Sequence, residues 1–233
     1  YCSAVQCSKM LWLKENKPEE FDSSVINESV MATGNEVGDL AMGLFGDYVE
    51  VPYGNLGEMV ETTKRLVDAQ TPIITEASFS VDNLFCSVDI LKNLGNREVE
   101  LYEVKSSTET KDIYYHDIAF QCHVMTLLGY DVKNCYIVHI NNKYCRNGEL
   151  NLKELFTIED VTDDALLLRA DVAERIKALR EYMEQTEEPS YEIGEQCFSP
   201  YECGFFGYCT KQLPKPNIFD VAGARMSTKL KCY

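Results

Sequence analysis

Two short stretches decide the fold of this chain, LFCSVDIL (residues 84–91) and EVELYEVK (residues 98–105). Both are rich in β-branched, aromatic and aliphatic residues, and Asn93 and Gly95 between them favour a turn, so the two stretches predict a β-hairpin. Side chains alternate along a strand, so Glu103 and Lys105 share one face while Val104 points toward the core. If the register places Asp89 alongside, we expect two carboxylates and one ammonium group to meet at one end of the hairpin.

This combination of side chains suggests metal-assisted chemistry on phosphate. Asp89 and Glu103 can hold Mg²⁺ or Mn²⁺, with the Val104 carbonyl as a third ligand, and Lys105 can position the attacking water or stabilise developing charge. Glu76, on the preceding predicted strand, is a candidate to extend the carboxylate cluster. The alternative is that these are solvated charges on an exposed sheet face.

Periodicity along the rest of the chain predicts one mixed α/β domain covering residues 1–233. Helices are expected over residues 8–17, 27–44, 56–69, 116–128 and 160–183, with Ser8 as the cap of the first and Val30 and Leu40 on the buried face of the second. Strands are expected over residues 73–81, 84–91, 98–106, 135–140 and 155–158, the first three as an antiparallel meander. The predicted core is therefore α-β-β-β-α-β, about residues 73–140, between flanks 1–72 and 141–233.

Composition limits the function classes. The chain has 233 residues, 45% of them hydrophobic, and contains neither an apolar run of membrane-spanning length nor a signal peptide, so a cytoplasmic protein is expected. It begins with Tyr rather than Met, so we expect its natural N-terminus to lie upstream. The net charge of −16 argues against a nucleic-acid binder with a broad basic surface, although the charged residues from Lys211 onward are basic except Asp220.

Ten cysteines are unevenly placed. Three of them, Cys86, Cys122 and Cys135, fall in apolar segments and are expected to be buried thiols. Five others gather near the two ends of the chain: Cys2, Cys7, Cys197, Cys203 and Cys209. Without an export signal a disulfide framework is disfavoured, so a metal or cluster site is the preferred interpretation, with unliganded thiols as the alternative.

The order of elements, together with Asp89 and the Glu103-Val104-Lys105 motif, resembles the core of the PD-(D/E)XK nucleases, a restriction-endonuclease-like fold of the lambda-exonuclease type. QCHVM (residues 121–125) resembles the Q-x-x-x-Y motif of RecB-type nucleases and CRISPR-adaptation exonucleases. Cys7, with Cys197-x5-Cys203-x5-Cys209, resembles the split iron–sulfur staple of the same group. The stretches QCSKMLWL, GNEVGDLA, HDIAFQCHVM and HINNKYCRNGELN most resemble an uncharacterised bacterial family that joins a RecB-like nuclease domain to a downstream exonuclease-like domain.

The resemblance covers nearly the whole chain and implies a metal-dependent DNA exonuclease in repair, recombination or phage defence, acting on single- or double-stranded ends. It implies Mg²⁺ or Mn²⁺ on Asp89, Glu103 and Val104, and a [4Fe–4S] cluster, or zinc in its place, on the four cysteines. The catalytic residues that it implies are Asp89, Glu103, Lys105, Gln121 and Glu76.

The chain also departs from the pattern of these nucleases. The metal-binding histidine usually found near residues 34–38 is absent, and Glu36 is either its substitute or a surface residue. Met125 replaces the tyrosine of Q-x-x-x-Y, and the gap between Cys197 and Cys203 is longer than usual. Two alternatives therefore stay open: an accessory or nucleic-acid-binding module with weak or no cleavage, and a cysteine-rich metal or redox protein. The final GARMSTKLKCY resembles the start of a further segment.

Overall fold

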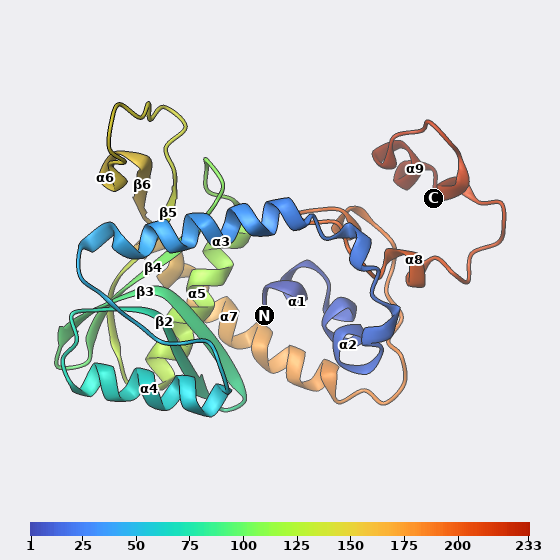
Figure 1. Ribbon diagram of the computed structural model, residues 1–233. Coiled ribbons are helices and arrows are strands. Elements are labelled where there is room, and N and C mark those ends of the chain that lie inside the picture. The colour runs from blue at the N-terminus through green and yellow to red at the C-terminus, as the bar shows by residue number, and fades with distance from the viewer. The chain divides into compact units, whose positions relative to one another are not determined.

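The computed structural model describes all 233 residues, and contacts within the chain divide them into two compact units. The first, here called the core unit, is Glu28–Glu174 and contains the whole predicted core. The second, here called the cysteine unit, combines Tyr1–Asn27 with Arg175–Tyr233. Figure 1 colours the chain from one terminus to the other. A single domain over residues 1–233 stays a prediction.

The core unit is built on one six-stranded mixed sheet in the order β1-β2-β3-β4-β5-β6, which confirms the mixed α/β class. Strands β2, β3 and β4 form the expected antiparallel meander, β5 lies parallel to β4, β6 is antiparallel to β5, and the short β1 lies parallel to β2. The strand bounds are β1 Val49–Glu50, β2 Ile73–Val81, β3 Leu84–Gly95, β4 Glu98–Lys105, β5 Asp131–Ile140 and β6 Phe156–Asp160.

The turn of the β3–β4 hairpin lies later in the chain than the sequence predicts. Gly95 pairs with Glu98, so Asn96 and Arg97 form the turn, both with positive φ, as a two-residue hairpin turn with mirror-image geometry requires. The pairing of β3 with β4 is irregular between Asn93 and Gly95, where the register shifts. Strand β3 therefore continues four residues past the predicted end at Leu91.

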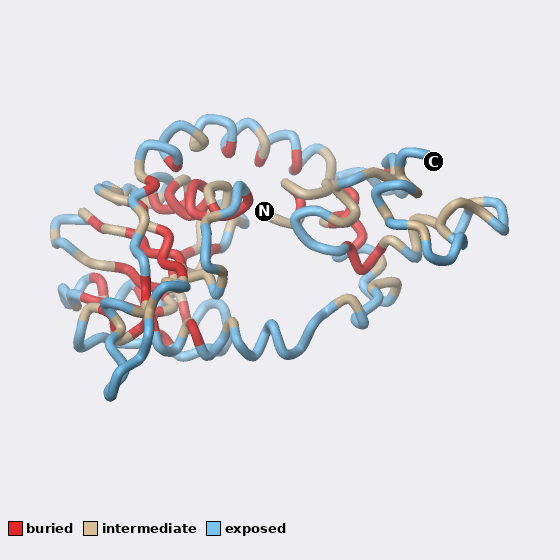
Figure 2. The backbone as a smooth tube through the Cα atoms, turned by 90° about the horizontal axis from the view of Figure 1, so that it is seen from above, coloured by how far each residue is buried: buried red, intermediate tan, exposed pale blue.

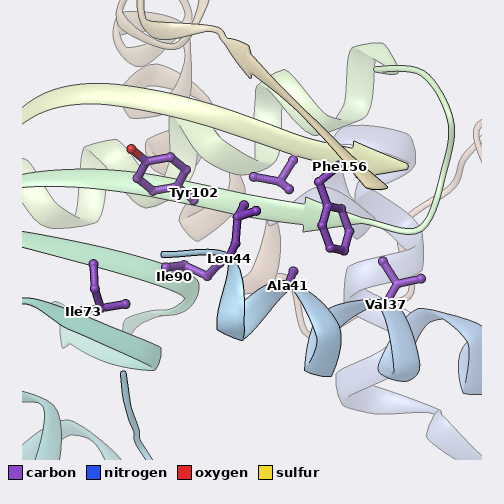
Figure 3. Packing of buried hydrophobic residues seen from close by; sticks show 8 residues of the cluster. Val37, Ala41, Leu44, Ile73, Ile90, Tyr102 and Phe156 are labelled. Carbon is purple, nitrogen blue, oxygen red and sulfur yellow. The ribbon is translucent and has the colours of Figure 1, made fainter. Parts of the chain in front are cut away.

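Helices cover both faces of the sheet in the core unit. Helix α3 (Glu28–Met42) packs Val37 and Ala41 on one face, in a buried cluster with Ile90 and Tyr102, and Figure 3 shows Val37 near Phe156. Helix α5 (Asp112–Leu127) lies on the other face, because it contacts Glu103 and Lys105, which alternate with the α3-facing Tyr102. Two further helices are α4 (Leu56–Asp68) and α6 (Leu152–Leu155), and α7 (Thr162–Met183) contributes residues to both units.

Two details of the predicted helices are wrong. Val30 and Leu40 are exposed rather than buried on α3, because the sheet contacts only the side of the helix that carries Val37 and Ala41. Ser8 is the first residue of α2 (Ser8–Asn16) rather than its cap. The cap residue is Cys7, and no side-chain hydrogen bond closes this helix end.

The cysteine unit has short elements and a small apolar core. Its buried cluster is formed by Met10, Trp12, Leu13, Cys203 and Phe205. Figure 2 shows that buried stretches are more extensive in the core unit.

No helix of the protein combines the length and the apolar character needed to cross a membrane. Besides α2, the short elements are α1 Cys2–Gln6, η1 Pro18–Glu20, η2 Ser23–Val25, η4 Glu195–Cys197, α8 Phe206–Cys209, η5 Ile218–Asp220 and α9 Met226–Cys232, while η3 (Gly43–Phe45) belongs to the core unit.

Candidate active site

The predicted meeting point of Asp89, Glu103 and Lys105 lies where β3 and β4 separate. The two strands pair as far as Ile90 and Tyr102, and beyond this pair β3 continues along β2 while β4 continues along β5. Asp89 lies just past the last pair, and its Oδ2 accepts a hydrogen bond from the Val104 N–H at 2.6 Å. The carboxylate thus satisfies a backbone donor that the strand ladder leaves open. We call Asp89 and Glu103-Val104-Lys105 the strand fork.

Helix α5 holds the two β4 side chains of the strand fork. Gln121 Nε2 donates to Glu103 Oε2 at 2.6 Å, and Asp117 Oδ2 lies 2.8 Å from Lys105 Nζ. Lys105 Nζ is also 2.5 Å from Glu103 Oε1 and 5.1 Å from the centre of the Tyr114 ring. Tyr114, Asp117 and Gln121 are spaced three and four residues apart, so one face of α5 presents all three to β4.

A cavity of about 230 Å³ adjoins the strand fork, and we call it the carboxylate cavity. The sheet contributes Glu76, Asp89, Ile90 and Val104 to its lining. Glu76 has a φ of 54°, a left-handed conformation that costs free energy for a residue with a side chain. This conformation interrupts the pairing of β2 with β3, which passes from Thr75 directly to Ala77. The interruption accompanies the placement of the Glu76 carboxylate beside Asp89.

Helix α3 forms the other wall of the carboxylate cavity. Its lining residues are Gly34, Asn35, Gly38, Asp39 and Met42. Gly34 and Gly38 are one turn apart, and a Cβ atom built on either would meet no other atom within 4 Å. The two glycines therefore leave open space on the face of α3 that lines the cavity, and Asp39 adds a further carboxylate to its wall.

Burial dominates the electrostatics of the strand fork. It raises the pKa of Asp89 from 3.8 to about 7, opposed by Lys105 and the Val104 N–H and assisted by the charges of Glu76 and Asp117. Burial and then the charge of Asp89 raise the pKa of Glu103 well above its ordinary value. Both carboxyl groups are therefore harder to ionise than in water, and a cation bound beside them would favour their ionisation.

Burial and neighbouring charges also set the pKa values of Lys105 and Glu76. Burial disfavours the ammonium form of Lys105, but the charges of Glu103 and Asp117 outweigh this effect and raise its pKa, so Lys105 stays charged. Burial also raises the pKa of Glu76, helped by the charges of Glu50 and Asp39 and opposed by a hydrogen bond from Ser87. The site is thus an acidic cluster with one fixed cation.

The structure brings the predicted core-unit residues together. Asp89, Val104 and Glu76 line the carboxylate cavity, and Glu103, Lys105 and Gln121 are joined by hydrogen bonds on the face of the sheet that α5 covers. Glu36 is exposed and does not line the cavity. Two residues of the site, Asp39 and Asp117, were not identified from the sequence. Asp117 lies one helical turn before Gln121, and that spacing could have identified it.

The terminal cysteines meet within the cysteine unit. Cys7, Cys197, Cys203 and Cys209 all line one small cavity of about 20 Å³, here called the cysteine cavity, whereas Cys2 does not. The Cys203 N–H donates to the Cys197 carbonyl at 2.9 Å, which closes the loop between these two residues. All ten cysteines of the chain are free thiols. Cys7 therefore shares one cavity with three cysteines that lie at least 190 positions later in the sequence, and a metal or cluster at this cavity stays a prediction.

Burial also controls the thiols of the cysteine cavity. It raises the pKa of Cys7 and of Cys203, and it raises that of Cys209 to about 11, against the opposing charge of Lys9. The pKa of Cys209 rises further through the charges of the other three cysteines, so the four sulfur atoms lie within interaction range of one another. In the metal-free protein the thiols of Cys7, Cys203 and Cys209 are therefore protonated at neutral pH, and a metal ion that binds them would replace their protons.

No three His, Cys, Asp or Glu side chains are positioned as ready-made ligands of one metal ion. At the strand fork, Lys105 Nζ is paired with Glu103 Oε1, and burial raises the pKa of the Asp89 and Glu103 carboxyl groups. No protein-family model matches the chain, and a search of curated proteins finds no match either. The side chains of the two sites are therefore the basis on which a function can be proposed.

Proposed function

We propose that the protein is a divalent-metal-dependent nuclease with a RecB-like PD-(D/E)XK core, which hydrolyses phosphodiester bonds at DNA ends. The observation that carries this proposal is the convergence of Asp89, Glu103 and Lys105 at the strand fork. The order of α4, the β2–β3–β4 meander, α5 and the parallel strand β5 supports it.

The residues of the strand fork suit Mg²⁺ or Mn²⁺ in their chemistry. Both ions prefer oxygen ligands, and burial raises the pKa values of the half-buried Asp89 and the buried Glu103. Asp89 and Glu103 would hold the ion with the Val104 carbonyl, and Glu76 and Asp39 line the same cavity as further oxygen donors. A bound ion would polarise a phosphate oxygen and lower the pKa of a coordinated water.

The remaining residues orient the reacting groups. Gln121 holds Oε2 of Glu103 at 2.6 Å, which fixes the direction of the carboxylate. Lys105 stays charged and can orient the attacking water or stabilise the negative charge that develops on the phosphate. Gly34 and Gly38 keep the cavity open toward α3, which leaves room for a phosphate group beside the carboxylates.

The test is cleavage of linear DNA, single- and double-stranded, with Mg²⁺, Mn²⁺ or EDTA. Lys105→Ala should lower the cleavage rate by about 10²–10³-fold, because it removes charge stabilisation, while Mn²⁺ affinity stays within a few-fold of wild type. Lys92→Ala is a matched control, since Lys92 Nζ is also half-buried and lies 3.4 Å from a carboxylate, that of Glu100, but does not line the cavity. Normal cleavage by the Lys105 variant would remove the role given to this lysine.

The net charge of −16 favours a second candidate function, a module that binds nucleic acid weakly and does not cut it. The same assay separates the two. Metal-dependent cleavage that is lost in Asp89→Ala supports the nuclease. DNA binding without cleavage in either metal supports the accessory module, and neither binding nor cleavage contradicts both.

We also propose that Cys7, Cys197, Cys203 and Cys209 hold a [4Fe–4S] cluster or a zinc ion that ties the two ends of the chain together. Their shared cavity and the small apolar core around Trp12 support a structural role, because a bound metal would stabilise a unit with little buried apolar surface. Iron, sulfide and zinc analysis of anaerobically purified protein distinguishes the alternatives. A protein that holds neither metal after reconstitution contradicts the proposal.

A further inference from the structure

Asp117 is the carboxylate of the site that has no part in the metal site proposed above. It lies on α5 and its Oδ2 is 2.8 Å from Lys105 Nζ. It does not line the carboxylate cavity, and its side chain is about 29% exposed. The other carboxylate in contact with Lys105 is Glu103, at 2.5 Å, which is the residue assigned to the metal. Lys105 therefore lies between a proposed metal ligand and a second carboxylate.

This arrangement matters when a cation binds. A divalent ion on Glu103 would share the charge of that carboxylate and repel the ammonium group of Lys105. Asp117, which does not line the cavity, would remain a carboxylate partner of Lys105 in that state. The other contact of the ammonium group is the Tyr114 ring at 5.1 Å, which is a weaker partner than a carboxylate.

The geometry of α5 makes Asp117 suited to this task. Asp117 and Gln121 are four residues apart on the same helix face, and Gln121 donates to Glu103 Oε2 while Asp117 contacts Lys105. One helix face thus holds both side chains of the Glu103-Val104-Lys105 segment independently. Movement of Lys105 away from Glu103 need not change the position of either helix residue.

We propose that Asp117 is a positioning residue, which retains Lys105 at the strand fork when Glu103 releases it to bind a divalent ion. This inference rests on the proposed function, because it requires metal on Glu103 and a reaction that uses Lys105. Without Asp117, Lys105 would have Glu103 as its single carboxylate partner and would compete with the metal for it. Asp117 therefore promotes metal binding through Lys105 rather than by contact with the metal.

The experiment is a double-mutant cycle read out by Mn²⁺ affinity, measured calorimetrically on the full chain. Asp117→Asn should weaken Mn²⁺ binding about tenfold when Lys105 is present, and by no more than about twofold in a Lys105→Ala background. Asp117→Glu, which keeps the carboxylate, should stay within about threefold of wild type. Glu100→Gln is the matched control, since Glu100 contacts Lys92 on the same sheet and should leave Mn²⁺ affinity unchanged.

The outcomes separate the inference from the function on which it rests. Equal losses with and without Lys105 would overturn the inference, because Asp117 would then act by its own charge or by folding. No loss in Asp117→Asn would overturn it as well. Wild-type protein that binds no Mn²⁺ or does not cut DNA contradicts the proposed function instead. If Asp117→Asn does not fold, Asp117→Ser enters the same cycle.

At saturating Mn²⁺ the cleavage rate gives a second readout. Asp117→Asn should lower kcat about tenfold or more and leave KM for DNA within about twofold, because Lys105 acts on the reacting groups rather than on substrate binding. A higher KM with unchanged kcat would instead indicate that Asp117 helps to bind DNA, and would overturn the positioning role.

Discussion

Replacing Asp89 by asparagine should stabilise the metal-free protein, and by more as the pH rises. Asparagine keeps an oxygen that can accept the Val104 N–H and removes the carboxyl group whose pKa burial raises from 3.8 to about 7. The folded wild type holds this proton across a pH range in which the unfolded chain has released it. Its free energy of unfolding therefore falls as the pH rises between these two values, and ionisation of the folded group ends the fall above them.

The size of the effect follows from the two pKa values of Asp89, 3.8 and about 7. The difference between them lowers the free energy of unfolding of the wild type by about 2 kcal/mol at about pH 5.5 and by about 4 kcal/mol at about pH 8. The stability advantage of Asp89→Asn should accordingly grow by about 2 kcal/mol over this interval, and by about 1 kcal/mol if Glu103 takes up part of the proton.

Urea unfolding in EDTA, followed by circular dichroism at both pH values, measures this difference. Circular dichroism is preferable to fluorescence because the single tryptophan, Trp12, lies in the cysteine unit. Asp47→Asn is the control, since Asp47 is an exposed residue of the core unit outside the carboxylate cavity. An advantage that does not change with pH, or a variant less stable than wild type at pH 8, would refute the electrostatic account of Asp89.

Three further predictions concern other parts of the protein. Gly38→Leu should fold with unchanged or higher thermal stability, because nothing lies within 4 Å of the Cβ position. It should lose Mn²⁺ affinity, because the new side chain fills the carboxylate cavity. Circular dichroism measures the thermal stability and calorimetry measures the affinity. Cys209→Ser should abolish metal retention in the cysteine unit, whereas the exposed Cys145→Ser should not, as metal analysis will show. Glu188→Gln should cost about 1–3 kcal/mol in urea unfolding, because Lys9, which is 9% exposed, loses a carboxylate 2.7 Å away.

The strand fork could be predicted from sequence because it depends on local pattern. Alternation along residues 98–105 fixes which β4 side chains share a face, whereas the register that brings Asp89 beside them is set by the turn. The turn itself was misplaced, because Asn93 and Gly95 carry a turn composition while the chain uses Asn96 and Arg97. The site depends on the observed register, because pairing of Ile90 with Tyr102 is what places Asp89 level with Glu103.

The walls of the site could not be predicted in the same way. The left-handed φ of Glu76 leaves no signal in its residue type, since glutamate does not favour that conformation. Asp39 and Asp117 belong to the site only because α3 and α5 pack on opposite faces of the sheet, and this packing is a tertiary property. Charge spacing on a predicted helix could identify Asp117 but not the lysine it contacts.

The central claim is that the strand fork binds a divalent cation through Asp89 and Glu103. Anomalous diffraction from crystals of the protein grown with Mn²⁺ tests it most directly, because it locates the ion without reference to activity. We predict one strong peak within bonding distance of both carboxylates, on the side of the carboxylate cavity, and no such peak in Asp89→Asn crystals. Mn²⁺ found only elsewhere, with Lys105 still paired to Glu103, would contradict the claim.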